Sequence, residues 1–459
     1  MRKTLVLAVL ALMVLASLPL AQAADSGDSK WTFNGELRTR EEHLQNYSDF
    51  DDNANDLVDF MPYRARIGMN GQLSNNVMVG LAVQSFGVWG FNGDPRQSSS
   101  FPPTQQNFTT SPEQTTLYLG NVTLNHFIGN NFSVTVGRQE HMEGTGLIFG
   151  NEEFYNGTVY DGATGQWKFK NWELTGLAYI VREGFDPTTF FTPPCTTCGS
   201  EDTRVWGATG HLHFDLGKAK TNLDVYAYDL YDGVPASPAG KPDFVTYGGH
   251  WWRPVDNKAD AKAFPVDWNA EIALQNGHVR DSATNASSRL TGSIIDLSAG
   301  WNIAGGNMVH RFFVGAIEES GDKDLTDNKI KGWSDLFMSV HGRFGGADFF
   351  GSNFAAHSAG ITAWRAGYVG SMKDGKHKFG ATFWSFMPTE DKLTTGLGTV
   401  KVDDYGTEID LGYKYQYTDN VYFGAGVAEL SPKDGLTGGA GAPNDSVFRA
   451  VGVLDVKWK

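Results

Sequence analysis

The chain has 459 residues, of which 55 are glycine and 2 are cysteine, and its formal net charge is −15. Two cysteines exclude a disulfide-built scaffold and a protein with several zinc centres, and the acidic balance argues against nucleic acid as a partner. Charged residues make up only 19% of the chain, yet the mean hydropathy of −0.32 excludes a bundle of apolar membrane helices.

The first residues have the pattern of a secretory signal peptide. Two basic residues open the chain, an apolar run covers 4–20, and a small-x-small cleavage pattern ends at Ala23. An uncleaved membrane anchor is the alternative, but the run is short for a membrane span. We therefore expect residues 1–23 to be a signal peptide and residues 24–459 to form a single domain outside the cytoplasm.

From Trp31 onward, apolar and polar residues alternate with a period of two, which is the spacing of a β-strand. The clearest alternating stretches are 31–40, 63–70, 132–136, 268–275 and 409–417. Many stretches run about ten residues, the length of a tilted membrane-spanning strand, and aromatic residues gather at their ends. Lipid offers the backbone no hydrogen-bond partner, so a sheet in lipid must close on itself. The pattern predicts an all-β transmembrane antiparallel β-barrel rather than a soluble β-sandwich.

Short connections rich in Gly, Asn and Asp alternate with long ones, as expected for short periplasmic turns and long extracellular loops. The short connections lie near 74–76, 129–131, 170–171, 215–219, 305–306, 374–375 and 418–420. The long connections lie near 46–60, 92–112, 141–157, 182–203, 231–243, 278–288, 318–359, 389–402 and 432–446. Strict alternation requires a further strand near 244–253, followed by a periplasmic link over 254–266. With this strand the predicted barrel has eighteen strands, and sixteen is the alternative.

Strand parity predicts which charged side chains face the lumen. Arg38, Arg40, Arg64 and Arg66 point inward from two neighbouring strands, and their guanidinium groups suit carboxylate or phosphate groups. The same parity places three further candidate lining residues inward, namely Glu271, Arg365 and Arg449. Other inward charges nearly balance the set, namely Lys168, Lys414, Glu36, Glu42, Glu173, Asp224, Asp296, Glu408, Asp410 and Asp455. The alternative is that many of these groups form salt-bridged ladders along the wall and select nothing.

Arg138 departs from this pattern, because strict alternation aims it at lipid beside Val136. An arginine in the middle of a bilayer costs a barrel about 2–4 kcal/mol. We therefore expect a β-bulge to turn Arg138 inward to the constriction, and the alternative is that the strand ends near Gly137. The loop 141–157 that follows either folds into the mouth of the pore or is an ordinary surface loop.

Three smaller features are open to a second interpretation. Cys195 and Cys198 lie in the long link 182–203, and after export we expect them to form a loop disulfide, with a redox or metal role as the alternative. His211 and His213 are expected to be polar lumen residues, with a metal site as the alternative. Three tyrosines are candidate stacking partners for a sugar in the lumen, with a place at the ends of the wall as the alternative, namely Tyr179, Tyr226 and Tyr228.

Acidic runs in two predicted loops carry enough carboxylates to bind Ca²⁺ or to bridge to lipopolysaccharide through cations. These runs comprise Asp49, Asp51, Asp52 and Asp56 in one loop and Asp322, Asp324 and Asp327 in another. Solvated loop charge is the favoured interpretation of both runs, with a loop-bound Ca²⁺ as the alternative, and we expect no cofactor. No nucleophile motif, phosphate-binding loop or metalloprotease motif occurs, so we do not expect an enzyme.

Several short motifs follow one another along the chain. They are GELRTRE at 35–41, YRARIG at 63–68, VGRQE at 136–140, GLIFG at 146–150, YDG at 160–162, Glu271 with Gln275 and Gly277, and SGD at 320–322. In this order they resemble the alginate export family of outer-membrane β-barrel porins. The resemblance implies an eighteen-stranded monomeric pore whose arginine-lined lumen passes an anionic substrate.

These features together predict a passive channel of the Gram-negative outer membrane for anionic or polar solutes, such as an oligosaccharide or a small organic acid. The alternative is a structural or adhesive barrel with a blocked lumen that acts through its long loops. We expect a monomer that contacts outer-membrane lipid and lipopolysaccharide. The outer-membrane insertion machinery is a further expected partner, because the closing strand at 447–459 carries an aromatic residue, Trp458, near its end.

Overall fold

The computed structural model describes most of the chain after the predicted signal peptide. The described residues are 30–47, 49–54, 56–89, 113–151, 153, 155–182, 202–232, 241–255, 258–280, 286–352, 358–372, 375–437 and 442–459. The predicted signal peptide at 1–23 and the predicted disulfide between Cys195 and Cys198 lie outside these residues, so both stay predictions.

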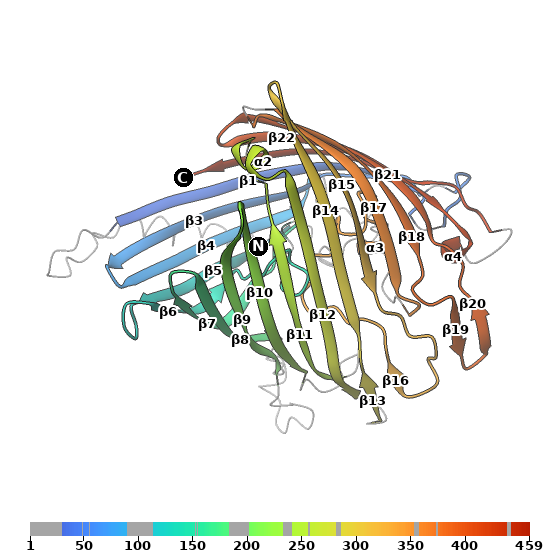
Figure 1. Cartoon of the computed structure of the whole chain (residues 1–459), viewed down its shortest axis with the longest axis horizontal. Helices are drawn as coiled ribbons and strands as arrows, with labels where there is room; N and C mark the ends of the chain where they lie inside the picture. The colour runs from blue at the N-terminus through green and yellow to red at the C-terminus, as the bar shows by residue number, and fades with distance from the viewer. Residues whose placement is uncertain are drawn as a thin grey trace.

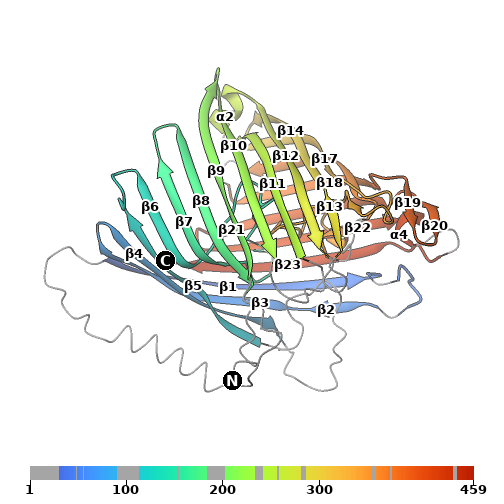
Figure 2. The same cartoon turned by 90° about the horizontal axis from the view of Figure 1, so that it is seen from below.

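Across the described residues, eighteen antiparallel strands form a closed barrel (Figure 1). In chain order they are β1 (Lys30–Gln45), β3 (Pro62–Ser74), β4 (Val77–Val88), β5 (Glu113–Asn125), β6 (Phe132–Gln139), β7 (Tyr160–Lys168), β8 (Trp172–Arg182), β9 (Thr203–Leu216), β10 (Ala219–Asp232), β11 (Lys241–Arg253), β12 (Val266–Arg280), β14 (Ser293–Gly305), β15 (Met308–Glu319), β17 (Ile361–Met372), β18 (His377–Met387), β21 (Gly406–Thr418), β22 (Val421–Pro432) and β23 (Val447–Trp458). Each strand pairs with its neighbours along the chain, and the ring closes where β1 pairs with β23 (Figure 2).

The chain also forms short strands and helices outside the eighteen strands of the barrel. The short strands are β2 (Val58–Phe60), β13 (Ser287–Leu290), β16 (Lys329–Ile330) and the hairpin of β19 (Lys392–Thr395) and β20 (Gly398–Lys401). β2 extends the pairing of β1. The helices are α2 (Lys258–Ala263), α3 (Phe349–Ser352) and α4 (Asp434–Thr437). Within the described part of the chain, every helix is too short or too polar to cross a membrane.

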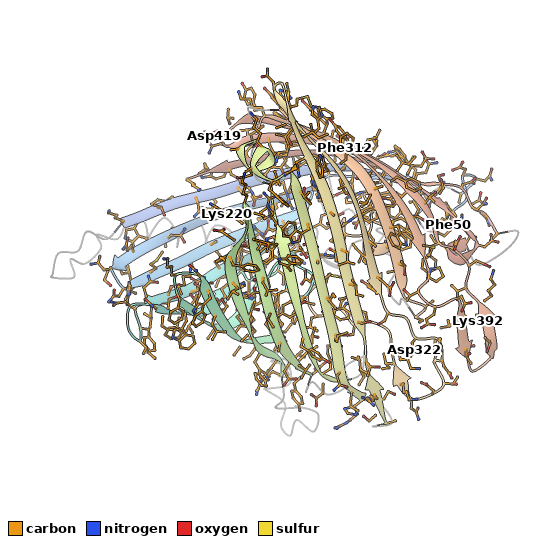
Figure 3. All side chains as sticks on the ribbon, viewed as in Figure 1. Phe50, Lys220, Phe312, Asp322, Lys392 and Asp419 are labelled. Carbon is orange, nitrogen blue, oxygen red and sulfur yellow. The ribbon has the colours of Figure 1, made fainter. Side chains whose placement is uncertain are left out.

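The predicted count of eighteen strands is confirmed, and the alternative of sixteen is wrong. The strand that alternation of the links required near 244–253 is β11, and the link after it contains α2. We call the end of the barrel with the short connections the turn end and the other end the loop end. Asp419 lies in a short turn and Asp322 in a long loop, and Figure 3 shows them at opposite ends of the molecule.

The two faces of the wall have the polarity that lipid outside and water inside require. On the outer face, Val225 is 60% exposed and Val314 is 62% exposed. On the inner face, Glu42 and Arg64 are buried. Tryptophans are half-exposed at the turn end, as at Trp458, which suits an aromatic girdle at a membrane interface.

Candidate pore constriction

Two long loops turn back into the barrel. The first inward loop lies between β6 and β7, and its described residues are 140–151, 153 and 155–159. Leu147 and Phe149 in this loop are completely buried. The second inward loop, residues 334–351 between β15 and β17, buries Phe344 and Ala347. Both loops bond to side chains on the inner face of the wall, so their apolar residues are covered by the barrel. Of the two possibilities for the loop 141–157, the structure has the inward one.

The two inward loops join each other inside the barrel. The Gly150 amide donates to the Phe337 carbonyl oxygen at 2.7 Å, and the Phe337 amide donates to the Ile148 carbonyl oxygen at 3.1 Å. The Ser339 amide donates to the Gly146 carbonyl oxygen at 2.9 Å. Gly150 is needed at this contact, because a Cβ atom there would lie 2.5 Å from the Ser339 amide nitrogen. The loops therefore form one unit in the interior.

The first inward loop is anchored by the predicted arginine cluster on β1 and β3. Arg64 Nη2 lies 2.6 Å from Glu153 Oε2 and 2.7 Å from Glu36 Oε1. Arg66 Nη1 lies 2.8 Å from Glu153 Oε1, and Arg38 Nη1 donates to the Glu153 carbonyl oxygen at 2.5 Å. All three arginines point inward, as parity predicts, but their guanidinium groups hold a loop.

Glu153 carries a negative charge into this cluster. Burial alone raises the pKa of Glu153, but the charges of Arg64 and Arg66 outweigh burial and lower this pKa below its ordinary value. The ionised carboxylate neutralises part of the cluster at neutral pH. The salt-bridged alternative therefore describes this part of the wall better than an open anion filter does.

The second inward loop is anchored on β1, β21 and β23. Arg449 Nη2 lies 2.6 Å from Glu42 Oε2, and Arg40 Nε lies 2.9 Å from Glu42 Oε1. Arg449 Nη1 donates to the Gly346 carbonyl oxygen at 2.9 Å. The Gly346 amide donates to Asp410 Oδ2 at 3.1 Å. Both peptide groups of Gly346 are thus tied to the inner wall.

Glu271 and Arg365 face inward on another part of the wall, between β12 and β17. Thr145 Oγ1 of the first inward loop donates to Glu271 Oε2 at 3.0 Å. Arg365 Nη2 lies 2.9 Å from Asp296 Oδ1, and Arg343 Nη1 of the second inward loop lies 3.7 Å from Asp296 Oδ2. The loop unit is therefore attached to several sides of the barrel.

The expected inward turn of Arg138 is wrong. The pairing of β6 with both neighbours runs without a register shift, so Arg138 keeps the outward parity of half-exposed Val136. Its Nη2 atom lies 2.5 Å from Asp161 Oδ2 on β7, and both side chains are substantially exposed. The outward ion pair reduces the cost of the arginine, so the strand needs no bulge.

A β-bulge does occur at this level, but it belongs to β5. The register of β4 and β5 shifts between Ala82 and Val83, so that Tyr118 is the extra residue. Tyr118 is buried, and the guanidinium carbon of Arg66 lies 3.7 Å from its ring centroid. The bulge therefore supports the arginine cluster on β3.

The three candidate stacking tyrosines face inward but are covered. Tyr179, Tyr226 and Tyr228 are at most 5% exposed. The ring centroid of Phe149 lies 4.8 Å from that of Tyr228 and 6.5 Å from that of Tyr179. The rings of Tyr179 and Tyr228 therefore pack against the first inward loop, and Tyr226 stacks on Tyr228. In this arrangement none of the three offers a face to a sugar.

The two histidines are polar lumen residues, as predicted. His211 Nδ1 lies 2.8 Å from Asp224 Oδ1, and His213 Nδ1 lies 2.7 Å from Asn222 Oδ1. Of the residues with described placement, no three His, Cys, Asp or Glu side chains form a group that fits a metal ion. A loop-bound Ca²⁺, the alternative interpretation of the acidic runs, stays untested.

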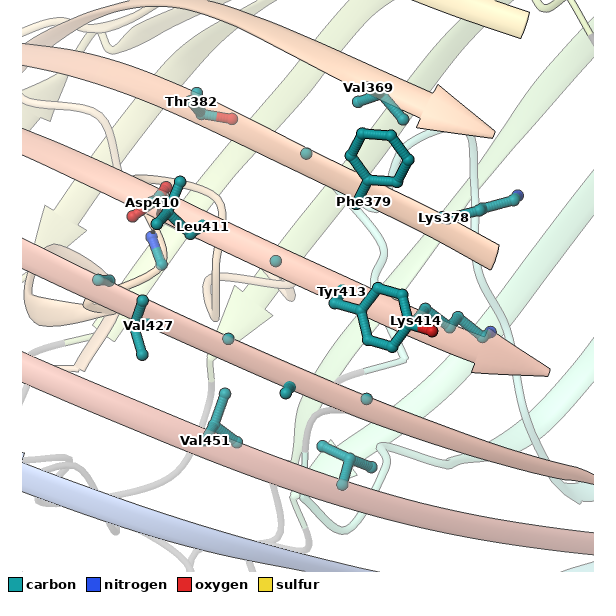
Figure 4. A pocket seen from close by; sticks show the side chains of 18 of the residues that line it. Val369, Lys378, Phe379, Thr382, Asp410, Leu411, Tyr413, Lys414, Val427 and Val451 are labelled. Carbon is teal, nitrogen blue, oxygen red and sulfur yellow. Dashed lines mark hydrogen bonds between the residues drawn. The ribbon is translucent and has the colours of Figure 1, made fainter. Parts of the chain in front are cut away.

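The sequence interpretation missed the second inward loop and an inner pocket beside it. The signal for the loop was present, since the long link 318–359 contains Phe337, Phe344, Phe349 and Phe350 among its glycines. The pocket has a volume of about 480 Å³ and lies along the inner face of β18, β21 and β22 (Figure 4). The second inward loop borders it through Gly346, so the loop unit leaves space on this side of the lumen.

Comparison with protein-family models finds no match, and no curated protein matches the sequence. Solved structures match the fold. OpdK of Pseudomonas aeruginosa, solved with vanillate, has a TM-score of 0.56 at 12% identity, over 93% of this chain and 99% of that chain. OccAB1 of Acinetobacter baumannii has a TM-score of 0.56 at 13% identity, over 93% of this chain and 96% of that chain. The outer-membrane protein OprD of P. aeruginosa has a TM-score of 0.54 at 10% identity, over 93% of this chain and 94% of that chain.

At these identities the likeness shows the fold alone, which is the eighteen-strand barrel of outer-membrane porins. The similar chains are channels rather than enzymes. No family model matches the chain, and the resemblance to the alginate export family stays a prediction.

Proposed function

We propose that this chain is a passive channel of the Gram-negative outer membrane for small anionic or polar solutes. The joined inward loops carry the proposal, because they narrow the barrel and leave a pocket of about 480 Å³ beside them. An apolar outer face suits lipid, and a charged inner face suits a water-filled path. Selection by size and charge then takes place where the loops approach the wall.

The preference for anions is supported by two lysines that face the lumen. Lys378 and Lys414 lie on β18 and β21, and among the described residues neither has a carboxylate partner. The arginines on β1 and β3 are less suited to this task, because Glu36 and Glu153 already pair with them. The proposed anion selectivity therefore depends on Lys378 and Lys414 more than on the arginine cluster of β1 and β3.

Two classes of substrate fit an anion channel. The resemblance to alginate export barrels implies an anionic oligosaccharide, and a small organic acid is the other class. The vanillate in the OpdK structure supports the second class. In either case we propose a monomer in contact with lipid and lipopolysaccharide, exported by its signal peptide and inserted by the outer-membrane insertion machinery.

Planar-bilayer recording of the purified chain tests the proposal. We expect stepwise single-channel currents, and in a potassium chloride gradient a reversal potential that shows preference for chloride. Liposome swelling with uronates, neutral sugars and amino acids of similar size then ranks the solutes. A strong preference for cations that persists after substitution of the four arginines and both lysines would contradict the anion channel.

A blocked barrel that acts through its loops is the second candidate function. The buried apolar core of the inward loops favours it, since Leu147, Ile148 and Phe149 are at most 2% exposed. This candidate predicts no single-channel current at any voltage and a cellular defect when the exposed loops alone are deleted. The channel predicts current in every preparation that contains folded barrels.

A further inference from the structure

A strip of the inner wall carries no side chains. Gly380 on β18 is the register partner of Gly412 on β21, and Gly412 is the partner of Gly426 on β22. Leu411 and Tyr413 on either side of Gly412 are half-exposed on the outer face, so Gly412 faces the lumen. Glycine in a strand often marks a place where a ligand approaches the backbone closely. The three glycines form the floor of the inner pocket.

The floor is flat and apolar. The backbone groups of the three glycines are used in the barrel ladder, so the floor presents few hydrogen-bonding groups to the lumen. Val369, Val451 and Val453 border the strip from β17 and β23. A Cβ atom at Gly412 would meet no atom within 4 Å, so the space above the middle of the strip is open.

The pocket has charges at its two ends. Figure 4 shows Lys378 and Lys414 at one end and Thr382 and Asp410 at the other. Lys378 and Lys414 are register partners, and both are exposed. Like charges directly opposite each other on one face destabilise a sheet. Inside the described part of the barrel no carboxylate pairs with either lysine, whereas buried Arg64 pairs with Glu36 and Glu153, and buried Arg449 pairs with Glu42.

One of the two lysines makes a cation–π contact with an aromatic ring. Lys414 Nζ lies 4.0 Å from the ring centroid of Tyr422, which also lines the pocket. The ring holds the ammonium group at the pocket rim and leaves its charge uncompensated. The arrangement presents two positive charges next to an apolar floor.

We propose that this pocket is a binding subsite for a carboxylate attached to an apolar ring, such as an aromatic or alicyclic acid. The carboxylate lies between Lys378 and Lys414, and the ring lies flat on the strip of Gly380, Gly412 and Gly426. A uronate fits less well, because its hydroxyl groups would lose water without gaining partners on this floor. The subsite rests on the proposed channel function and names its substrate class.

Binding of benzoate and cyclohexanecarboxylate to the full-length chain tests the subsite, with glucuronate as the comparison. Calorimetry in detergent gives the dissociation constants, and planar bilayers give the transient blockades of current. We expect both ring acids to bind more tightly than glucuronate. The K378Q/K414Q variant is expected to weaken them by about tenfold or more, the effect of two lost charge-assisted contacts.

Gly412→Leu and Gly452→Leu form a matched pair for the floor. Both positions have no atom within 4 Å of a Cβ, but Gly452 lies on the outer face of β23 and outside the inner pocket. We expect G412L to abolish binding of the ring acids and G452L to leave it unchanged. Heat-modifiable gel mobility checks that both variants are folded barrels.

Each result decides a separate question. Unchanged benzoate binding in folded G412L, or glucuronate binding as tight as that of benzoate, overturns the subsite. If the wild-type chain carries no current but calorimetry shows lysine-dependent binding of ring acids, the channel proposal fails and the subsite stands. If current flows but ring acids do not bind, the subsite fails and the channel stands.

Discussion

Arg64 Nη2 lies 2.6 Å from Glu153 Oε2, and this ion pair joins the wall at β3 to the loop that narrows the lumen. Arg64 is only 2% exposed. Arg66 holds the other carboxylate oxygen of Glu153, and the Tyr118 hydroxyl donates to the same oxygen at 3.1 Å. Because so many contacts meet at one carboxylate, the position of the first inward loop depends on the charge of Glu153.

Glu153→Gln removes this charge and keeps the shape of the side chain. We expect the first inward loop to leave the wall more often, since a hydrogen bond to a charged group contributes about 1.5–3 kcal/mol. Single-channel conductance and open-channel noise are expected to rise. Asp161→Asn is the matched control, because its ion pair with Arg138 lies on the outer face. Identical conductance and noise in E153Q and the wild type would contradict the anchoring role.

Arg449→Met breaks the most buried ion pair of the second anchor. Glu42 is 1% exposed and Arg449 is 4% exposed, so the variant leaves a buried carboxylate with Arg40 as its remaining cation. Loss of one partner of a buried pair costs about 3–5 kcal/mol. We expect a lower unfolding midpoint in guanidinium chloride, and partial recovery in E42Q/R449M. A double variant no more stable than R449M would mean that the pair does not act as a unit.

Much of this fold is visible in the sequence because a barrel wall is a local pattern. Alternation places the strands, and the order of short and long links requires β11, which the structure contains. Parity likewise places Arg38, Arg64 and Arg449 on the inner face, where the structure has them. The strand positions and the parity use only residues within one strand, and β11 follows from the order of the links along the chain.

The position of the second inward loop and the direction of Arg138 cannot be inferred from the sequence, because contacts between distant segments determine them. The second inward loop is held at the inner wall by Arg449 and Asp410, which lie far from Gly346 in the chain. Arg138 was misplaced for a related reason. The predicted bulge on the strand of Arg138 is absent, and the bulge in this region lies on the neighbouring strand β5 at Tyr118. The alternation within one strand does not show the register of its neighbour.

Arg138→Gln tests the outward placement. An exposed ion pair contributes about 0–1 kcal/mol, so we expect a change in unfolding free energy within that range. The reversal potential in a salt gradient is expected to stay at its wild-type value, because the side chain does not face the lumen. Arg66→Gln is the inward comparison and is expected to alter conductance through Glu153. A shift of reversal potential in R138Q would place Arg138 in the pore after all.

Gly150→Ala separates the inward loops from each other. The added Cβ would lie 2.5 Å from the Ser339 amide nitrogen, so the contact between the loops must open. We expect larger current fluctuations and faster proteolysis within the inward loops of folded barrels. Gly305→Ala at the turn end of β14 is the control, because a Cβ there meets no atom within 4 Å. Equal fluctuation and proteolysis in the two variants would argue that the loops do not act as one unit.

Acid is expected to loosen the inward loops through two carboxylates. Burial alone raises the pKa of both Glu153 and Asp348, but the charges of Arg64 and Arg66 lower the pKa of Glu153, and the hydrogen bond from His341 lowers that of Asp348. A carboxylate with a lowered folded pKa stabilises docking fully above its ordinary pKa of about 4, and this stabilisation is lost as the pH falls through the lower folded value.

Conductance at constant ionic strength is therefore expected to stay level from about pH 7 to about pH 5 and to rise below about pH 4. In E153Q this rise is expected to be smaller, because one of the two titrating groups is absent. Single-channel recordings across this range measure the effect. A rise centred near about pH 6.5, the ordinary pKa of histidine, would assign the change to imidazole groups instead of to these carboxylates.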